Sequence, residues 1–281
     1  MRTIAESEMV LNADGSVYHL NLLPDDLAET VITVGDPDRV AEVSKCFDRI
    51  ELRKGKREFL THTGYIGNTR VSVVSTGIGT DNIDIVLNEL DALVNLDLEK
   101  RQVKKALKPL SIIRIGTSGS IRPDIGCDDI LVSSHALGLD TLMQYYQWDR
   151  SREGFPEGLH EILGTLPSYF APASEDLLAK FSDQQQGITV TAPGFYAPQG
   201  RYVRAEPAFP DLFRKLAFFT WKNRTFTNLE METAGIYALS ALLGHKALSV
   251  NAILGNRTAG TFSKNPEKTI SAAIDLVLER L

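Results

Sequence analysis

An arginine interrupts an apolar run at residues 112–119, which read IIRIGTSG. The run has the composition of a buried strand, so Arg114 should have a partner, because an unpaired buried guanidinium is costly. Thr117, Ser118 and Gly119 follow at the expected carboxyl end of that strand, where open α/β sheets bind ligands. Arginine binds phosphate in a bidentate manner, and hydroxyl and amide groups complete such a site. The pattern predicts an anion site, with an internal ion pair to a carboxylate as the alternative.

Two other turns follow predicted strands and could bind the same anion. In VGDPDR (34–39), Gly35 allows a ligand to approach the backbone closely, and Arg39 adds a positive charge. In STGIGTDNI (75–83), glycines precede a predicted helix, and helix N-termini attract anions. The second segment has neither the Gly-Lys-Ser/Thr of a Walker loop nor the glycine spacing of a Rossmann fingerprint. Plain strand-to-helix turns are the alternative for both.

A third segment has the chemistry of base recognition. In GFYAPQGRYVR (194–204), Gln199 and Arg201 are two residues apart, so they point the same way if the segment is extended. Glutamine both donates and accepts hydrogen bonds, whereas arginine only donates. Together they suit a planar base edge with an imide and two carbonyls, and Phe195 or Tyr196 could stack on its face. A surface loop is the alternative.

Two carboxylates flank a methionine in NLEMETAG (228–235), at a predicted loop-to-helix boundary. Glu230 and Glu232 could accept hydrogen bonds from vicinal sugar hydroxyls. The alternative is the ordinary preference of helix N-termini for acidic residues.

These segments must be positioned by alternating strands and helices. Short β-branched runs predict strands at 30–35, 69–76, 110–116, 129–136, 187–192 and 246–255. Apolar residues at helical spacing predict helices at 80–94, at 230–243 and at the C-terminus. The alternation predicts a largely parallel α/β sheet, and the absence of a linker predicts one domain over residues 1–281. The charged segment 97–108 is predicted to be a solvated helix or connector.

The composition excludes several functional classes. The net charge of −6 argues against a nucleic-acid or anionic-membrane binder, and no apolar run approaches a membrane span. The two cysteines, Cys46 and Cys127, are predicted to be small core residues in a reducing cytoplasm. The histidines and cysteines show no metal-binding spacing.

Seven segments occur in one order: GDPxR, REF, STGIG, RIGTSG, FYxxQxR, ExE and NR. In this the chain resembles the nucleoside phosphorylase superfamily, and within it the uridine phosphorylase branch, from about residue 19 to the C-terminus. The resemblance implies reversible phosphorolysis of uridine, with deoxyuridine and thymidine as further substrates, in pyrimidine salvage.

The resemblance also implies roles for individual residues. The implied phosphate site comprises Gly35, Arg39, Arg114, Thr117 and, reaching across a dimer interface, Arg57. The implied ribose site comprises Glu230, Met231, Glu232 and His19 of a neighbouring copy. The implied base site comprises Phe195, Gln199, Arg201, Ser118 and Gly119. Arg201, Gln199 and Arg114 are the implied catalytic residues.

The resemblance implies a three-layer α/β/α sandwich with a central mixed, partly barrel-like sheet, usually assembled as a hexamer built from dimers. Inorganic phosphate is a co-substrate, and no other cofactor is expected. Some relatives bind a monovalent cation, so the resemblance points to a candidate structural K⁺ site near Glu58, beside Asn82. Residues 1–17 form an N-terminal extension and residues 97–108 a charged insertion.

Three alternatives share these features. A purine nucleoside phosphorylase normally has an aspartate where this chain has Asn256-Arg257. A nucleosidase on the same fold lacks the phosphate arginines. A non-catalytic nucleoside-binding protein would bind without turnover. Gly255 stands where the uridine phosphorylase branch has an aliphatic residue against the base. This difference predicts a wider pocket and weaker discrimination among uridine, 5-methyl and deoxy substrates.

Overall fold

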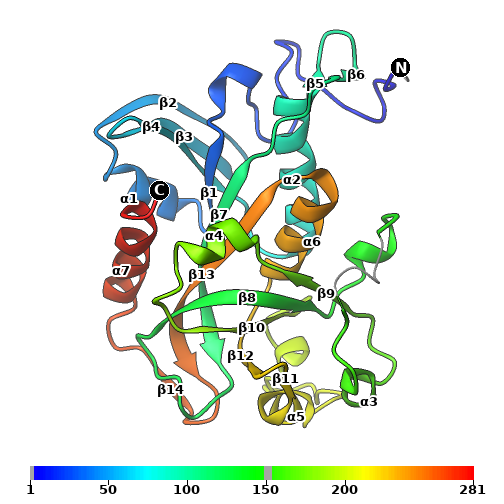
Figure 1. Cartoon of the computed structure of the whole chain (residues 1–281), viewed down its shortest axis with the longest axis vertical. Coiled ribbons are helices and arrows are strands. Elements are labelled where there is room, and N and C mark those ends of the chain that lie inside the picture. Colours follow the sequence, from blue (N-terminus) through cyan, green and yellow to red (C-terminus); the bar gives the residue numbers. More distant parts are fainter. Residues whose placement is uncertain (1–2, 149–153) are drawn as a thin grey trace.

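The computed structural model describes residues 3–148 and 154–281 (Figure 1). The strands are β1 (Thr30–Val34), β2 (Arg49–Lys56), β3 (Phe59–Ile66), β4 (Thr69–Ser75), β5 (Leu96–Asp97), β6 (Gln102–Val103), β7 (Ser111–Ser120), β8 (Ile130–Gly138), β9 (Tyr169–Pro172), β10 (Gln186–Thr191), β11 (Thr220–Trp221), β12 (Arg224–Glu230), β13 (Lys246–Asn256) and β14 (Thr261–Phe262). The α-helices are α1 (Asp38–Ser44), α2 (Thr80–Asn95), α3 (Leu159–Leu163), α4 (Glu175–Ala179), α5 (Leu212–Phe218), α6 (Thr233–Leu243) and α7 (Pro266–Leu278). Short 3₁₀ turns include η1 (Pro24–Asp26), η2 (Leu142–Gln144) and η4 (Ala197–Gln199).

One mixed sheet runs through the described part of the chain, in the order β2-β3-β4-β1-β7-β13-β8-β10-β12-β11. Strand β12 pairs with β10 and also with β7, through Asn228–Ser120 and Leu229–Gly119. This second pairing closes β7, β13, β8, β10 and β12 into a five-stranded barrel. The expected mixed, partly barrel-like sheet is therefore confirmed. The expectation of a largely parallel sheet was wrong, because the β2–β3, β3–β4 and β8–β13 pairings are antiparallel.

Helices flank the central strands on both sides. Figure 1 shows α1 and α7 on one flank of β1, β7 and β13, and α2 and α6 on the other. The apolar stripe predicted for 80–94 is buried along α2, where Ile83, Val86, Leu87, Leu90 and Leu93 are at most 1% exposed. Helix packing thus covers strands rich in valine and isoleucine, as expected for a sheet buried on both faces.

Strand β7 is longer than its apolar run. It continues through Gly116 to Ser120 because β13 pairs with it along this length and β12 joins at its end. Strand β1 pairs with β7 only as far as Ile115. The strand was expected to end at residue 116, but residues 117–120 continue it beyond the end of β1.

Other expectations were met in part or not at all. The 97–108 segment is a connector rather than a solvated helix, the two forms expected, and β5 and β6 pair there as a small hairpin. Cys46 is exposed and Cys127 half-buried, so neither is a core residue. Strands β2, β3 and β12 were not predicted. No helix in residues 3–148 and 154–281 has the length and apolar character needed to cross a membrane.

The N-terminal segment and the charged 97–108 segment lie together. The N-terminal segment packs on the β5–β6 hairpin, where the Ile4 amide donates to the Arg101 carbonyl at 2.8 Å. In return, Arg101 Nη1 donates to the Met9 carbonyl at 2.6 Å. Hydrogen bonds to Arg101 therefore hold the N-terminal segment against the 97–108 segment.

Candidate active site

A cavity of about 1000 Å³ opens at the carboxyl ends of β1, β4, β7 and β12. The structure brings twelve of the predicted site residues into its wall: Gly35, Arg39, Arg114, Thr117, Ser118, Gly119, Phe195, Gln199, Arg201, Glu230, Met231 and Glu232. They come from segments spread over about 200 residues of chain, so the fold alone assembles them.

Arg114 lines the cavity and is 5% exposed. Its Nη2 contacts Glu232 Oε2 at 2.6 Å and Glu230 Oε2 at 3.1 Å. Its Nη1 donates to Asn251 Oδ1 at 3.0 Å. Burial acts to lower the pKa of Arg114, but the two carboxylates outweigh it and raise that pKa. The internal ion pair left open by the sequence is therefore present, on a guanidinium that also lines the cavity.

The two carboxylates differ in their other partners. Glu230 Oε2 accepts hydrogen bonds from the Glu232 and Thr233 amides, both at 2.9 Å, and its Oε1 accepts from the Thr191 hydroxyl. Glu230 thus ends β12 and satisfies the first turn of α6, as helix N-termini require. Glu232 accepts from the Gly79 amide at 2.8 Å and from Arg114. Burial raises the pKa of Glu232, and the charge of Arg114 opposes that rise.

Arg39 occupies a second position on the cavity wall, in the first turn of α1. Its Nε is buried and has no hydrogen-bond partner among the residues that the structure describes. Burial lowers the pKa of Arg39, and nearby Asp36 opposes this effect. A buried donor without a partner is unusual in a native protein and is a feature of binding sites. Gly35 lies beside it, where an added Cβ would be 3.4 Å from the Gly77 carbonyl oxygen.

Aromatic and polar side chains form the other end of the cavity. Gln199 ends the η4 turn rather than lying on an extended segment, yet Arg201 Nη1 reaches its Oε1 at 2.5 Å. The Arg201 guanidinium also stacks on the Phe195 ring, 3.7 Å from its centroid. Burial and the charge of Arg257 lower the pKa of Arg201 to about 10. Residues expected to meet on a strand therefore meet across a tight turn.

Arg257 is a site residue that the sequence reasoning did not assign. Its Nη1 donates to the Gln199 carbonyl at 2.9 Å, and its Nη2 donates to the Gly200 carbonyl at 3.2 Å. It therefore holds the turn that carries Gln199 and Arg201. The NR segment was noticed as part of the family pattern and as a departure from the purine enzymes, but Arg257 was given no role. An arginine two residues after Gly255, just past the end of β13, was the available signal.

Two predicted residues lie outside this cavity. His19 Nδ1 contacts Glu89 Oε1 at 2.7 Å, and the His19 amide also donates to this buried carboxylate. Arg57 is exposed at the tip of the β2–β3 hairpin, with a φ of 56°. Neither lines the cavity of its own chain. Their roles in the site of a neighbouring copy stay predictions.

Glu58 and Asn82 do lie together on the cavity wall. Asn82 Nδ2 donates to Glu58 Oε1 at 3.4 Å, beside the Gly77 turn. In the described residues, no group of three or more histidine, cysteine, aspartate or glutamate side chains is arranged to hold a metal ion.

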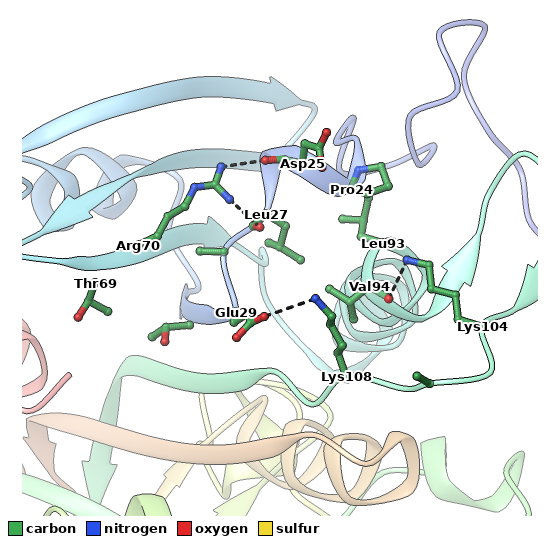
Figure 2. Close-up of a pocket in the computed structure, with 13 residues that line it drawn as sticks. Pro24, Asp25, Leu27, Glu29, Thr69, Arg70, Leu93, Val94, Lys104 and Lys108 are labelled. Carbon is green, nitrogen blue, oxygen red and sulfur yellow. Dashed lines mark hydrogen bonds and ion pairs between the residues drawn. The ribbon is translucent and has the colours of Figure 1, made fainter.

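A second cavity of about 620 Å³ lies at the opposite ends of the same elements (Figure 2). It is lined by Thr30 and Thr69, which begin β1 and β4, and by Val94 near the end of α2. The cationic side chains that line it have partners, and Arg70 donates to the Leu27 and Asp25 carbonyls. Lys104 donates to the Val94 carbonyl at 2.9 Å, and Lys108 lies 3.8 Å from Glu29. The candidate catalytic groups are therefore all in the first cavity.

Comparisons with known proteins agree with this fold. A family model described as the phosphorylase superfamily matches residues 29–279. The chain therefore belongs to the phosphorylase superfamily.

Individual relatives narrow the comparison. The chain is 32% identical to a uridine phosphorylase of Thermococcus kodakarensis, over 91% of this chain and 83% of that protein. It is 27% identical to a DeoD-type purine nucleoside phosphorylase of Caldanaerobacter subterraneus subsp. tengcongensis, over 93% and 98%. A solved Trypanosoma brucei nucleoside phosphorylase, described as showing uridine phosphorylase activity, superposes with a TM-score of 0.89 at 29% identity, covering 97% and 99%.

Proposed function

We propose that this protein catalyses the reversible phosphorolysis of uridine to uracil and ribose 1-phosphate. The observation that carries the proposal is the set of charged and polar side chains that line one cavity. Arg39 and Arg114 lie at one end with Glu232 beside them, and Gln199 lies with Arg201 at the other. This sequence of groups matches phosphate, sugar and base in that order.

At the phosphate end, Arg114 and Arg39 provide charged donors, and Thr117 and the Gly35 backbone provide neutral ones. Charge-assisted bonds from a guanidinium to phosphate are the strongest of these contacts. The unpartnered Arg39 Nε supports the assignment, because an anion would satisfy it. We assign Arg57 of a neighbouring copy as a third charge on the same phosphate.

At the sugar, Glu232 is the better acceptor for the ribose hydroxyls, because the hydrogen bonds of Glu230 are already used by α6. Met231 lies between them against the sugar, and His19 of the neighbouring copy approaches the 5′-hydroxyl. Because Glu232 pairs with Arg114, the same ion pair connects the sugar and phosphate positions.

At the base, Gln199 and Arg201 donate to the carbonyl oxygens and Gln199 also accepts from the imide. Ser118 and Gly119 line the same end, and Phe195 stacks on the ring. The lining residues at this end carry no carboxylate, whereas recognition of purine N7 would be served by an acid. This favours a pyrimidine. The DeoD-type relative keeps a purine substrate as the second candidate.

The reaction needs no protein nucleophile. A phosphate oxygen bonds to C1′ while the bond from C1′ to N1 breaks, and the bonding pair leaves with uracil. The uracil anion then takes a proton from water. The sugar develops positive charge in an oxocarbenium-like transition state, as it does in glycoside hydrolysis. The protein contributes positioning and charge stabilisation: Arg114 orients phosphate, and Arg201 with Gln199 stabilises the leaving base.

Several properties of the intact enzyme belong to the same proposal. We assign a homo-oligomer with sites shared across a dimer interface, a hexamer in its full assembly. Phosphate is the only co-substrate, and K⁺ binds as a structural ion near Glu58. Unpaired cysteines are typical of a reducing compartment, which supports the cytoplasm.

The experiment is a substrate comparison at saturating phosphate with uridine, thymidine and inosine. The proposal predicts uracil release as the fastest reaction and thymine release as a slower one. Preferential release of hypoxanthine from inosine would contradict the assignment of Gln199 and Arg201, and binding without release of any base would contradict an enzyme.

A further inference from the structure

Two glycines face the base end of the cavity on neighbouring strands. Gly119 of β7 pairs with Gly255 of β13, and both line the cavity. Neither carries a side chain, so a planar ligand can lie directly against backbone here. The wall at this point therefore depends on residues that face the two glycines.

Phe262 of β14 is that facing residue. It is the cross-strand neighbour of Gly255, and cross-strand neighbours share one face of a sheet. A Cβ added at Gly255 would be 3.7 Å from Phe262 Cδ2. The phenyl ring thus borders the space that a side chain at position 255 would occupy.

The ring is exposed while its backbone is anchored. Phe262 is 67% exposed, although it lines the cavity. Next to its strand partner Gly255, Asn256 is buried and donates to the Ile125 carbonyl at 2.7 Å. Directly after Phe262 in the chain, Ser263 is buried, and its amide donates to the Leu254 carbonyl at 2.7 Å. Phe262 therefore presents a fixed apolar surface that a bound base would cover.

We propose that Phe262 is a specificity-determining residue, an inference that rests on the proposed function. Its ring closes the base end over a pyrimidine seated at Gly119 and Gly255. Because residue 255 has no side chain, the slot keeps room for a methyl group at the 5-position of the base. Phe262 supplies apolar contact to both bases, and Gly255 removes the steric discrimination between them.

The test compares uridine with 5-methyluridine, which share the ribose and differ only in that methyl group. Phe262→Ala is expected to raise KM about tenfold for both substrates with little change in kcat, because it removes apolar contact with the bound base. Phe262→Leu should recover part of this loss. Gly255→Val is expected to lower kcat/KM for 5-methyluridine about tenfold relative to uridine, because the added methyls occupy the slot.

Phe218→Ala is the matched control, since Phe218 is 81% exposed on α5 and does not line the cavity. An unchanged KM in Phe262→Ala, or an equal effect of Gly255→Val on both substrates, would overturn the inference while leaving uridine phosphorolysis intact. If the unmodified enzyme cleaves inosine but neither pyrimidine nucleoside, the proposed function fails and the inference fails with it.

Discussion

Arg114 Nη2 lies 2.6 Å from Glu232 Oε2, so the cation proposed for phosphate and the carboxylate proposed for ribose form one ion pair. Both side chains are buried, at 6% and 8% exposure. Neither group can be removed without changing the environment of the other. The phosphate and nucleoside sites should therefore be coupled in binding as well as in catalysis.

Removing Arg114 should damage both activity and stability. Arg114→Ala leaves Glu230 and Glu232 buried without their cation, and breaking a buried pair in this way costs about 3–5 kcal/mol. Chemical denaturation measures this loss. The double variant Arg114→Met, Glu232→Gln removes both charges, so it should regain much of the stability but none of the activity. Equal destabilisation of the single and double variants would contradict the ion-pair account.

Arg201 should contribute through charge on the leaving base. Arg201→Ala is expected to lower kcat by roughly 10²–10³, the effect of losing a preorganised donor. The loss should be smaller with 5-fluorouridine, whose base carries negative charge more readily. Single-turnover rates for the two substrates measure this difference. An equal loss for both would assign Arg201 to binding alone.

The pH dependence should reveal the influence of Arg257 on Arg201. The pKa of Arg201, lowered to about 10 by burial and the charge of Arg257, means that its cation is lost as pH rises through that value. Removing the neighbouring charge in Arg257→Met should raise this pKa and move the alkaline decline of kcat/KM to higher pH.

Arg257→Lys is the control for this experiment, because it keeps the charge but loses the paired contacts to the Gln199 and Gly200 carbonyls. It should leave the alkaline limb in place. Ionisation of uridine is common to all three enzymes, so it does not affect the comparison. If the alkaline decline of kcat/KM moves equally in both variants, the contacts of Arg257 and not its charge would determine the pKa of Arg201.

The shared site can be tested by mixing inactive variants. Arg57→Ala lacks the residue proposed to act on a neighbour's phosphate, and Arg114→Ala lacks the residue of its own site. In a mixed pair of subunits, one site carries both defects and the other carries neither. Unfolding and refolding the two variants together should therefore restore activity. No recovery despite formation of mixed oligomers would place Arg57 outside the site.

His135 should make stability pH-dependent. Burial, with the charges of Arg224 and Lys222, lowers the pKa of this histidine to about 4, while the unfolded chain keeps its usual value near 6.5. Between these values the unfolded state binds more protons, so stability falls as pH falls.

The free energy of unfolding should therefore decrease from pH 7 to pH 4 more steeply for the unmodified protein than for His135→Phe. Phenylalanine can keep the stacking on Phe170, whose ring centroid lies 5.3 Å from that of His135. Parallel stability curves for the two proteins would contradict this explanation.

The site was more predictable from sequence than the sheet. Arg114 was recognisable because a guanidinium among isoleucines must have partners, and Glu230 and Glu232 are those partners. Barrel closure was not visible in residue patterns, because it depends on β12 pairing with both β7 and β10. Such pairing is a long-range property that strand propensity does not encode.

The strand predictions relied on β-branched apolar runs, so they also missed an edge strand. Strand β2 reads RIELRKGK, alternates between exposed and half-buried residues, and lies at the sheet edge. Its charges concealed it, although charged side chains are typical of edge strands. The role of Arg257 could not be predicted either, because its partners are backbone carbonyls of a turn nearly sixty residues away in the sequence.

The most direct measurement is release of free uracil from uridine with and without inorganic phosphate, with the sugar product identified. The account predicts that release requires phosphate and yields ribose 1-phosphate, because phosphate is the nucleophile held by Arg39 and Arg114. Uracil release at the same rate without phosphate, with free ribose as product, would contradict the central claim that these arginines hold the attacking group.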